Sequence, residues 1–180
     1  MKIIAVAAMS LDGFITRGSE PGTAFTSQAD KDWFQLTMRD FPIKVFGRKT
    51  FEVSKDFIIN QSRTDAASLR IVMTRDPASY HHMCLPERLE FTDSQATDIV
   101  ASLKQRNVEN EKVAILGGGA VYSAFLNAGL LDEFWITLEP QLFGSGTPLA
   151  TELSQATLAL KESSQLGPSS LLLKYQCTKS

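Results

Sequence analysis

The stretch Val113-Ala114-Ile115-Leu116-Gly117-Gly118-Gly119-Ala120-Val121-Tyr122 decides the fold class of this chain. Its apolar residues form a short buried strand, three glycines follow, and the pattern after them is that of a helix. Because glycine has no Cβ atom, the backbone can turn sharply and approach a ligand, and the first amides of the helix have no partners of their own. The stretch therefore predicts either a site for a phosphate or flat cofactor, or a tight turn that only returns the helix to the sheet.

Further strands surround this one in the predicted fold. Residues 3–9 form a continuous apolar run, which is typical of a strand covered on both faces in a parallel sheet. Similar short runs predict strands at 43–47, 69–74, 89–92, 113–116 and 134–139, and residues 156–163 and 170–177 resemble an antiparallel pair.

Helical patterns separate most of these strands. They begin at Ser27 and end near Asp40, begin again at Arg48, and run from Asp93 or Ser94 to about Arg106. A further helical pattern follows the three glycines. Strands that alternate with helices imply parallel crossovers. We therefore expect an α/β fold with a central, mostly parallel twisted sheet, helices on both faces and a C-terminal antiparallel hairpin.

Composition limits the classes of function. A chain of 180 residues with 43% hydrophobic and 21% charged residues fits one globular domain spanning 1–180. Its net charge of −2 argues against a general nucleic-acid binder. The N-terminal apolar run is too short for a signal peptide or a membrane helix, so we expect no membrane partner and a cytoplasmic location. Cys84 and Cys177 lack a metal-binding spacing, which predicts free thiols and no metal.

A long loop and a helix cap are predicted at the start of the first helix. Residues 16–27 are rich in turn formers and predict a long loop of the kind that often covers a site. Ser27 is a good N-cap, and Asp30 stands at the capping-box position three residues later. Asp30 can therefore be either a helix cap or a functional carboxyl group.

Five motifs, in their order and spacing, resemble the dihydrofolate reductase fold. They resemble more closely the C-terminal reductase domain of bacterial riboflavin biosynthesis proteins (RibD). The chain is similar to a stand-alone member of that family. The motifs are Met9-Ser10-Leu11-Asp12-Gly13-Phe14-Ile15, Asp30-Lys31-Asp32-Trp33-Phe34, Phe46-Gly47-Arg48-Lys49-Thr50-Phe51-Glu52, Leu116-Gly117-Gly118-Gly119-Ala120-Val121-Tyr122 and Phe143-Gly144-Ser145-Gly146-Thr147-Pro148-Leu149.

The resemblance implies a reductase that binds NADPH across the ends of the central strands. Gly47, Arg48, Lys49 and Thr50 would then meet the pyrophosphate at a helix N-terminus, where positive charge and free amides suit phosphate. The pair Thr74-Arg75 resembles the family position for the adenosine 2′-phosphate, which favours NADPH over NADH.

Other cofactor neighbours follow from position in the family alone. The resemblance implies a cis peptide bond between the first two of the three glycines. Ala120 differs from relatives with a larger basic or polar residue there, so adenine stacking from it is not expected. The remaining cofactor-binding residues that the resemblance implies are Ala7, Ala8, Ile15, Leu116, Gly117, Gly118, Gly119, Val121 and Tyr122.

In such a reductase, hydride transfer to a C=N bond of the substrate needs a proton source beside the nicotinamide. Asp30 lies where dihydrofolate reductases carry the acid that binds the pterin, and Asp12 is its rival as a catalytic or substrate-binding group. Asp12 could instead organise its loop or form the Asp-Gly turn. Thr137 matches a family threonine of the substrate pocket, and Trp33 and Phe34 would wall that pocket unless they are core residues.

These observations predict an NADPH-dependent reductase of a small nitrogen heterocycle, pyrimidine or pterin, similar to 5-amino-6-(5-phosphoribosylamino)uracil reductase. An authentic dihydrofolate reductase and a non-catalytic NADP-binding protein are the alternatives. The loop at Glu20–Phe25 lacks the folate enzymes' Pro-Trp pair, and the chain lacks the zinc ligands of the deaminase usually fused to the riboflavin enzymes. Relatives commonly form homodimers, and Phe134-Trp135-Ile136 is either an exposed apolar edge for such a dimer or ordinary core.

Overall fold

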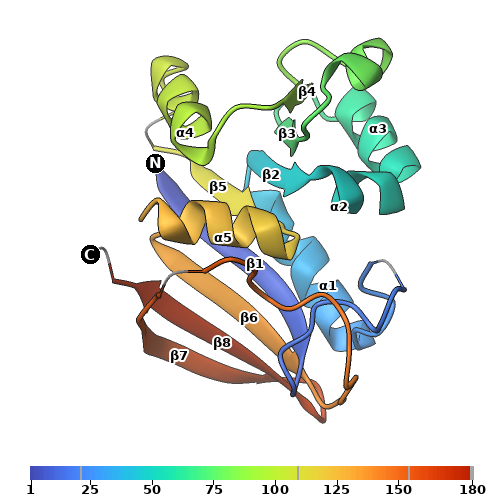
Figure 1. Cartoon of the computed structure of the whole chain (residues 1–180), viewed down its shortest axis with the longest axis vertical. Helices are drawn as coiled ribbons and strands as arrows, with labels where there is room; N and C mark the ends of the chain where they lie inside the picture. Colours follow the sequence, from blue (N-terminus) through green and yellow to red (C-terminus); the bar gives the residue numbers. More distant parts are fainter. Residues whose placement is uncertain (21, 109, 154, 179–180) are drawn as a thin grey trace.

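A single eight-stranded sheet organises the fold in the computed structural model, which describes residues 1–20, 22–108, 110–153 and 155–178. Its strand order is β4-β3-β2-β5-β1-β6-β8-β7 (Figure 1). The strands are β1 (Lys2–Ser10), β2 (Ile43–Gly47), β3 (Leu69–Met73), β4 (Leu89–Thr92), β5 (Lys112–Ile115), β6 (Glu133–Glu139), β7 (Leu158–Leu166) and β8 (Ser170–Cys177).

The strand directions confirm the expected fold class. Neighbouring strands from β4 to β6 pair in parallel, whereas β8 pairs antiparallel with both β6 and β7. Strand β5, which contributes the first residues of the deciding stretch, is inserted between β2 and β1. The C-terminal hairpin is present, although its first strand begins at Leu158, slightly later than the sequence pattern predicted.

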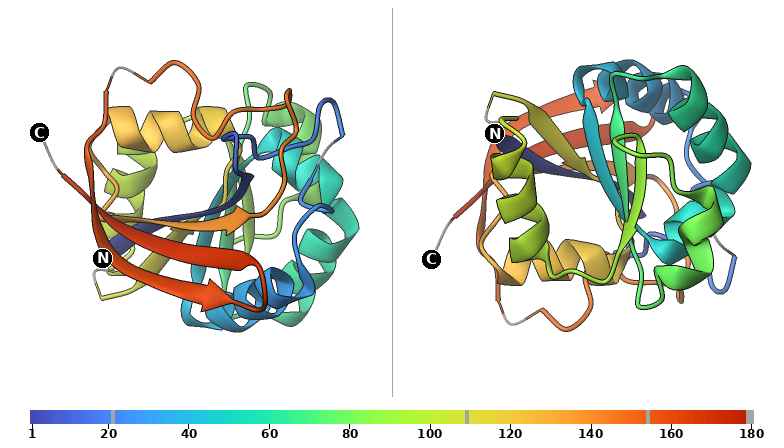
Figure 2. Two further views of the ribbon diagram at one scale, coloured as in Figure 1. Left: turned by 90° about the horizontal axis from the view of Figure 1, so that it is seen from below. Right: turned by 90° about the horizontal axis from the view of Figure 1, so that it is seen from above.

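Helices cover both faces of the sheet, as Figures 1 and 2 show. Helices α4 and α5 pack on one face, where Ile99, Leu103 and Phe125 meet apolar side chains of the central strands. The opposite face is covered by α1 and the α2–α3 segment. The α-helices are α1 (Gln28–Thr37), α2 (Arg48–Val53), α3 (Lys55–Thr64), α4 (Ala96–Gln105) and α5 (Gly119–Asn127), and short 3₁₀ helices span Met38–Asp40 and Ala78–Met83.

Two helix starts differ in detail from the predictions. Helix α4 begins at Ala96 rather than at an Asp93 or Ser94 cap, because Ser94 bonds locally to Thr92: its amide donates to Thr92 Oγ1 at 3.0 Å. The helical pattern that begins at Arg48 is divided at Ser54 into α2 and α3.

The segment Phe134-Trp135-Ile136 is core and not an exposed edge. Strand β6 lies between β1 and β8, and Phe134 and Ile136 are 1% and 4% exposed. A docking edge at this place is therefore excluded by the sheet order. No disulfide bond joins the exposed Cys84 to the buried Cys177.

Neither a membrane span nor a metal cluster is found among the residues that the structure describes. Within those ranges, no helix is long and apolar enough to cross a bilayer. In the same part of the chain, no three His, Cys, Asp or Glu side chains are grouped as metal ligands.

Candidate active site

A large cavity opens at the carboxyl ends of β1, β2 and β5, with a volume of about 2190 Å³. Ligands of open α/β sheets bind at this edge, where the strand order reverses. One wall is α1, another is the α2–α3 segment, and residues of the 16–27 loop such as Thr16, Thr23 and Thr26 also line it. Since pockets for single small molecules measure ~300–1,000 Å³, this one has room for two ligands.

Two glycine turns meet at the centre of the cavity. The amide of Gly47 donates to the carbonyl of Gly117 at 2.7 Å, which joins the turn after β2 to the turn after β5. The Gly117–Gly118 peptide bond is cis, as the resemblance implied. A Cβ atom on Gly119 would lie 2.7 Å from the carbonyl oxygen of Pro148, so a side chain there would collide with backbone. Close packing of backbone segments thus requires glycine here.

Both helices that leave these turns begin without a side-chain cap. The N-cap residues are Gly47 for α2 and Gly118 for α5, and neither supplies a side-chain acceptor. The first amides of each helix therefore lack the usual local partner and are available to an anion. Gly117, Gly118, Gly119 and Val121, which the resemblance implies as cofactor neighbours, all line the cavity.

Tyr122 locks the second turn in place. Its side chain is 3% exposed, and its hydroxyl group donates to the carbonyl of Val6 at 2.6 Å. A Cβ atom on Gly117 would lie 2.8 Å from that hydroxyl oxygen. Tyr122 lines the cavity, but its proton is already used within the protein. Its clearest effect is to hold the glycine turn against β1.

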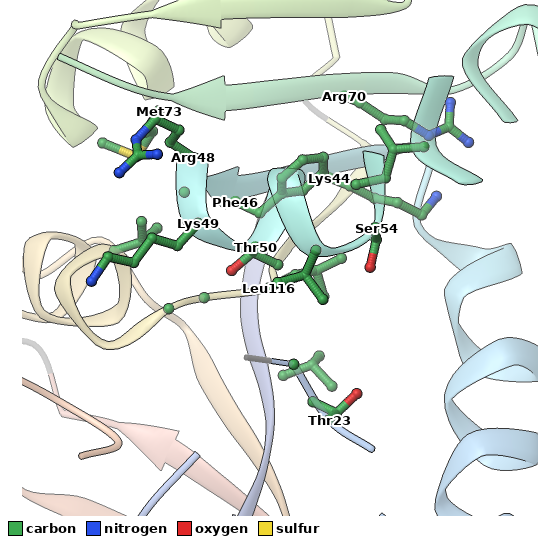
Figure 3. A pocket seen from close by; sticks show the side chains of 18 of the residues that line it. Thr23, Lys44, Phe46, Arg48, Lys49, Thr50, Ser54, Arg70, Met73 and Leu116 are labelled. Carbon is green, nitrogen blue, oxygen red and sulfur yellow. The ribbon is translucent and has the colours of Figure 1, made fainter. Parts of the chain in front are cut away.

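Basic side chains lie at one end of the cavity. Figure 3 shows Arg48 and Lys49 at one end of the pocket, with Thr50 beside them. Thr74 and Arg75 line the same space from the end of β3. The carboxylate of Asp76 accepts hydrogen bonds from the amide and hydroxyl of Ser79 at 3.2 and 2.5 Å, which directs its negative charge to its own turn.

Asp30 lies on α1 and is only 7% exposed. Ser27 caps this helix as predicted, because its Oγ accepts from the Asp30 amide at 3.2 Å. The reciprocal half of the expected capping box is different: Glu139 Oε1, not Asp30, accepts from the Ser27 amide at 3.0 Å. Glu139 also accepts from the Ser170 hydroxyl at 2.8 Å. This exchange leaves the Asp30 carboxyl group facing the cavity that it lines.

Two buried hydroxyl groups accompany Asp30. Within the described residues, Thr26 Oγ1 and Thr137 Oγ1 are buried and make no hydrogen bond. Burial raises the pKa of Asp30 and the charge of Glu139 adds to this, whereas the nearby hydroxyls of Thr137 and Thr26 oppose it. Because buried polar groups are nearly always satisfied, unpaired hydroxyls beside a buried carboxyl group indicate a place for a polar ligand. Thr137 itself, predicted as a residue of the substrate pocket, is fully buried and is not among the residues that line the cavity.

Asp12 is placed differently from Asp30. Its carboxylate accepts from the Ser10 hydroxyl at 2.5 Å and from the amides of Phe143 and Gly144 at 2.9 and 2.7 Å, and it is not among the cavity-lining residues. The hydrogen bond from Ser10 and the backbone bond from Gly144 lower its pKa. Asp12 therefore organises the loop, which was one of its predicted alternatives, and Asp30 is the acid within the cavity.

The remaining predicted residues line the cavity. Trp33 and Phe34 lie on the α1 wall, where Trp33 also packs 6.4 Å from Trp135. Ala7, Ala8, Ile15 and Leu116 line the cavity as well. The sequence analysis missed four residues that the structure brings to the site or its support, because each belongs to an otherwise ordinary loop or strand: Thr26, Lys44, Arg70 and Glu139.

An α/β sheet with two glycine turns beside a cavity that contains basic residues and a buried carboxyl group is suited to bind a phosphorylated small molecule. The chain belongs to the RibD C-terminal domain family, whose model matches residues 1–172. It is 31% identical over 175 residues to the uncharacterized protein YwjB of Bacillus subtilis, covering 92% of each chain.

Solved structures agree with this family. A putative riboflavin biosynthesis protein from Shewanella sp. PV-4 has a TM-score of 0.72 at 25% identity, with 99% of each chain covered. A deaminase and 5-amino-6-(5-phosphoribosylamino)uracil reductase from Thermotoga maritima has a TM-score of 0.75 at 14% identity, covering 98% of this chain and 56% of that longer one. A dihydrofolate reductase from Enterococcus faecalis in complex with NADP(H) has a TM-score of 0.64 at 18% identity, covering 98% and 96%. Together the family and these folds support a RibD-like reductase.

Proposed function

We propose that this protein is an NADPH-dependent reductase that transfers a hydride to a small nitrogen heterocycle of the pyrimidine or pterin type. One observation carries the proposal. A single cavity contains the two glycine turns, the basic residues beside them and the buried Asp30 carboxyl group. This arrangement has a place for a phosphorylated cofactor and, next to it, a place for a polar ring.

The residues at the cofactor end fit a nicotinamide dinucleotide phosphate. Two uncapped helix starts and the side chains of Arg48 and Lys49 suit a pyrophosphate. Thr74 and Arg75 offer a hydroxyl group and a guanidinium group for a 2′-phosphate. When bound, the nicotinamide would supply the hydride. The glycine turns permit close approach of the backbone, and Ala8 and Ile15 line the same cavity without bulky polar groups.

Asp30 supports the substrate half of the proposal. Since burial raises the pKa of this carboxyl group, it holds a proton more firmly than an exposed aspartate does. A protonated carboxyl can donate a hydrogen bond to a ring nitrogen, which makes a C=N bond a better hydride acceptor. The hydroxyls of Thr26 and Thr137 would orient the carboxyl group, and Thr26, which lines the cavity, would also contact the ring.

Thermal unfolding in the presence of cofactor tests the proposal. NADPH at about one hundred times its dissociation constant stabilises a protein by about 2.7 kcal/mol, which should raise Tm by about 5–10 °C for a chain of this size. NADH at the same concentration should raise it much less. Arg75→Ala should remove most of the difference between the two cofactors, whereas Arg63→Ala, an exposed arginine outside the cavity, should leave it unchanged.

The outcomes separate the alternatives. Equal shifts with NADPH and NADH in the wild type would defeat the 2′-phosphate site, and no shift with either would defeat the reductase. Cofactor binding without reduction of any pyrimidine or pterin would instead support the non-catalytic alternative. Oxidation of NADPH by dihydrofolate at a rate typical of enzymes would identify a folate reductase.

A further inference from the structure

A buried carboxylate at the end of β6 is held at the start of α1 by neutral donors alone. Glu139 is 1% exposed. Its Oε1 accepts from the amide and the hydroxyl of Ser27, at 3.0 Å each, and its Oε2 accepts from the Ser170 hydroxyl at 2.8 Å. Among the described residues, no cationic side chain forms a salt bridge with it. Because a buried charge without an opposite charge lowers stability, such groups are typical of functional sites.

Alternate residues of β6 meet successive turns of α1. Side chains two apart on a strand point to the same side, and residues three apart at a helix lie on one face. From the middle of β6 to its end, the facing pairs are Trp135 with Trp33, Thr137 with Asp30, and Glu139 with Ser27. Glu139 is thus the last of three contacts that set how α1 lies along β6.

Ser27 connects the carboxylate of Glu139 to the helical turn that carries Asp30. The Ser27 hydroxyl donates to Glu139 and accepts from the Asp30 amide at 3.2 Å. The Ser27 amide, which can only donate, is directed to the same oxygen of Glu139. Without this carboxylate the N-cap of α1 would lose its anchor, so the position of Asp30 in the cavity depends on Glu139.

The charge of Glu139 also acts on the carboxyl group of Asp30. Burial is the main reason why the pKa of Asp30 is raised, and the negative charge of Glu139 adds to it. The hydroxyls of Thr137 and Thr26 and the charge of Lys31, the next residue on α1, lower this pKa. Lys31 is exposed, so water and salt screen its charge, whereas Glu139 is buried. Glu139 is therefore the charge whose effect on Asp30 is least screened.

We propose that Glu139 is a positioning residue for Asp30, which it seats in the cavity through Ser27 and whose proton it retains by placing a second buried negative charge nearby. The use of that proton in reduction rests on the proposed function, in which Asp30 contacts the substrate ring. Two carboxyl groups that interact titrate as a pair, and one of them keeps its proton to a higher pH than it would alone. The pair thus keeps an acid available at a pH where an isolated aspartate would have lost its proton.

Carbon-13 NMR of the side-chain carboxyl groups tests this role in the full chain without any ligand. The signal of Asp30 is identified by its loss in Asp30→Asn. Glu139→Gln keeps the shape of the side chain and an acceptor for Ser27 but removes the charge, so the midpoint of the Asp30 titration should fall by about one pH unit. Glu162→Gln, which changes an exposed glutamate of β7, is the matched control and should leave the midpoint unchanged.

Two further measurements separate the charge from a structural effect. Ser170→Ala removes one hydrogen bond of Glu139 but leaves its charge, so the Asp30 midpoint should stay closer to the wild-type value than in Glu139→Gln. In the wild type, the Glu139 signal, assigned through its backbone, should show a second inflection at the Asp30 midpoint, and Asp30→Asn should abolish it. This measurement does not require Glu139→Gln to fold.

Three results would overturn the proposal. They are an unchanged Asp30 midpoint in Glu139→Gln, an equal fall of the midpoint in Ser170→Ala, and a Glu139 titration curve that is the same with and without the Asp30 carboxyl group.

Failure of the proposed function gives a different result. If NADPH does not bind, the titrations still decide whether Glu139 and Asp30 titrate as a pair, since they use no cofactor, and a coupled pair would survive the loss of the reductase assignment. If NADPH binds but the two groups titrate independently, the role of Glu139 alone is wrong.

Discussion

The candidate site contains one buried carboxyl group whose charged form the protein stabilises poorly. Asp30 is buried beside two hydroxyls without hydrogen bonds and within the field of Glu139. A carboxyl group in such a setting lowers the stability of the folded protein. Groups of this kind, with a shifted pKa, are typical of functional sites.

Asp30→Asn should therefore increase stability while abolishing reduction. Because the folded-state pKa of Asp30 is raised above 3.8, the stability that its proton confers is complete below about pH 3.8 and is lost as the pH rises through the raised value. At pH 7 the variant should be about 1 kcal/mol more stable than the wild type in urea unfolding, and this advantage should shrink toward pH 4.

The control for this comparison lies on the same helix. Asp32 is exposed and accepts a hydrogen bond from Gln28 at 2.7 Å, so Asp32→Asn should change stability little at either pH. A loss of stability in Asp30→Asn at pH 7 would show that the carboxylate is well satisfied in the folded protein.

A second residue-scale prediction concerns the glycine turn. Gly117 has φ +89°, and a Cβ atom there would press on the Tyr122 hydroxyl, which the Val6 carbonyl holds in place. Gly117→Ala should cost about 2–3 kcal/mol in urea unfolding and weaken cofactor binding.

Gly129 provides the matched comparison, because it has φ +62° with nothing within 4 Å of the added Cβ. Gly129→Ala should lower the free energy of unfolding by only about 1 kcal/mol, because the left-handed backbone is its only source of strain. Equal losses in the two variants would mean that contact with Tyr122 contributes nothing.

At the scale of elements, buried carboxylates join strands that are distant in the sequence. Glu133 on β6 contacts Lys2 of β1 at 2.9 Å and Lys161 of β7 at 2.8 Å, and it accepts from Trp135 Nε1 at 2.8 Å. Burial alone would raise its pKa, but the hydrogen bonds from Lys161, Lys2 and Trp135 outweigh this and lower it to about 2. One carboxylate thus links three strands.

The charge of Glu133 should stabilise the fold over a defined range of pH. Its contribution is complete above the unfolded pKa of 4.5 and is lost as the pH falls toward the folded value of about 2. Glu133→Gln should lower the free energy of unfolding at pH 7 by about 1–2 kcal/mol, after allowance for the half-exposed lysines. Urea titrations at pH 7, 4 and 2.5 should show the difference from wild type diminish.

Glu162→Gln is the control for this series, because Glu162 is 53% exposed and pairs with Lys174 at 3.1 Å on the hairpin. Its effect should be small at every pH. A Glu133→Gln effect as small as that of Glu162→Gln would show that the three-strand link contributes little.

The elements also show what local sequence could and could not predict. Apolar runs locate the parallel strands, because a strand covered on both faces must be apolar throughout. The start of α4 and the division of α2 from α3 were not predicted, because both depend on local hydrogen bonds and backbone angles at Thr92, Ser94 and Ser54. Helix-cap statistics do not contain that information.

At the scale of the whole molecule, the site is a product of topology. Strand β5 enters between β2 and β1, and this insertion brings the turns at Gly47 and Gly117 within one hydrogen bond of each other. The same sheet places Asp30, Thr26 and Thr137 together, although they belong to a helix, a loop and a strand. No pattern within a short window of sequence encodes these contacts between distant segments.

The sequence by itself determined the class of fold and the two strand-glycine-helix junctions, because burial periodicity and glycine requirements are local properties of a chain. Only the tertiary structure decided which acid faces the cavity, which hydroxyls accompany it, and that Lys44 and Arg70 line it side by side from neighbouring strands. Those outcomes depend on strand register and on the direction of each side chain. Both arise when distant segments pack together and exclude water.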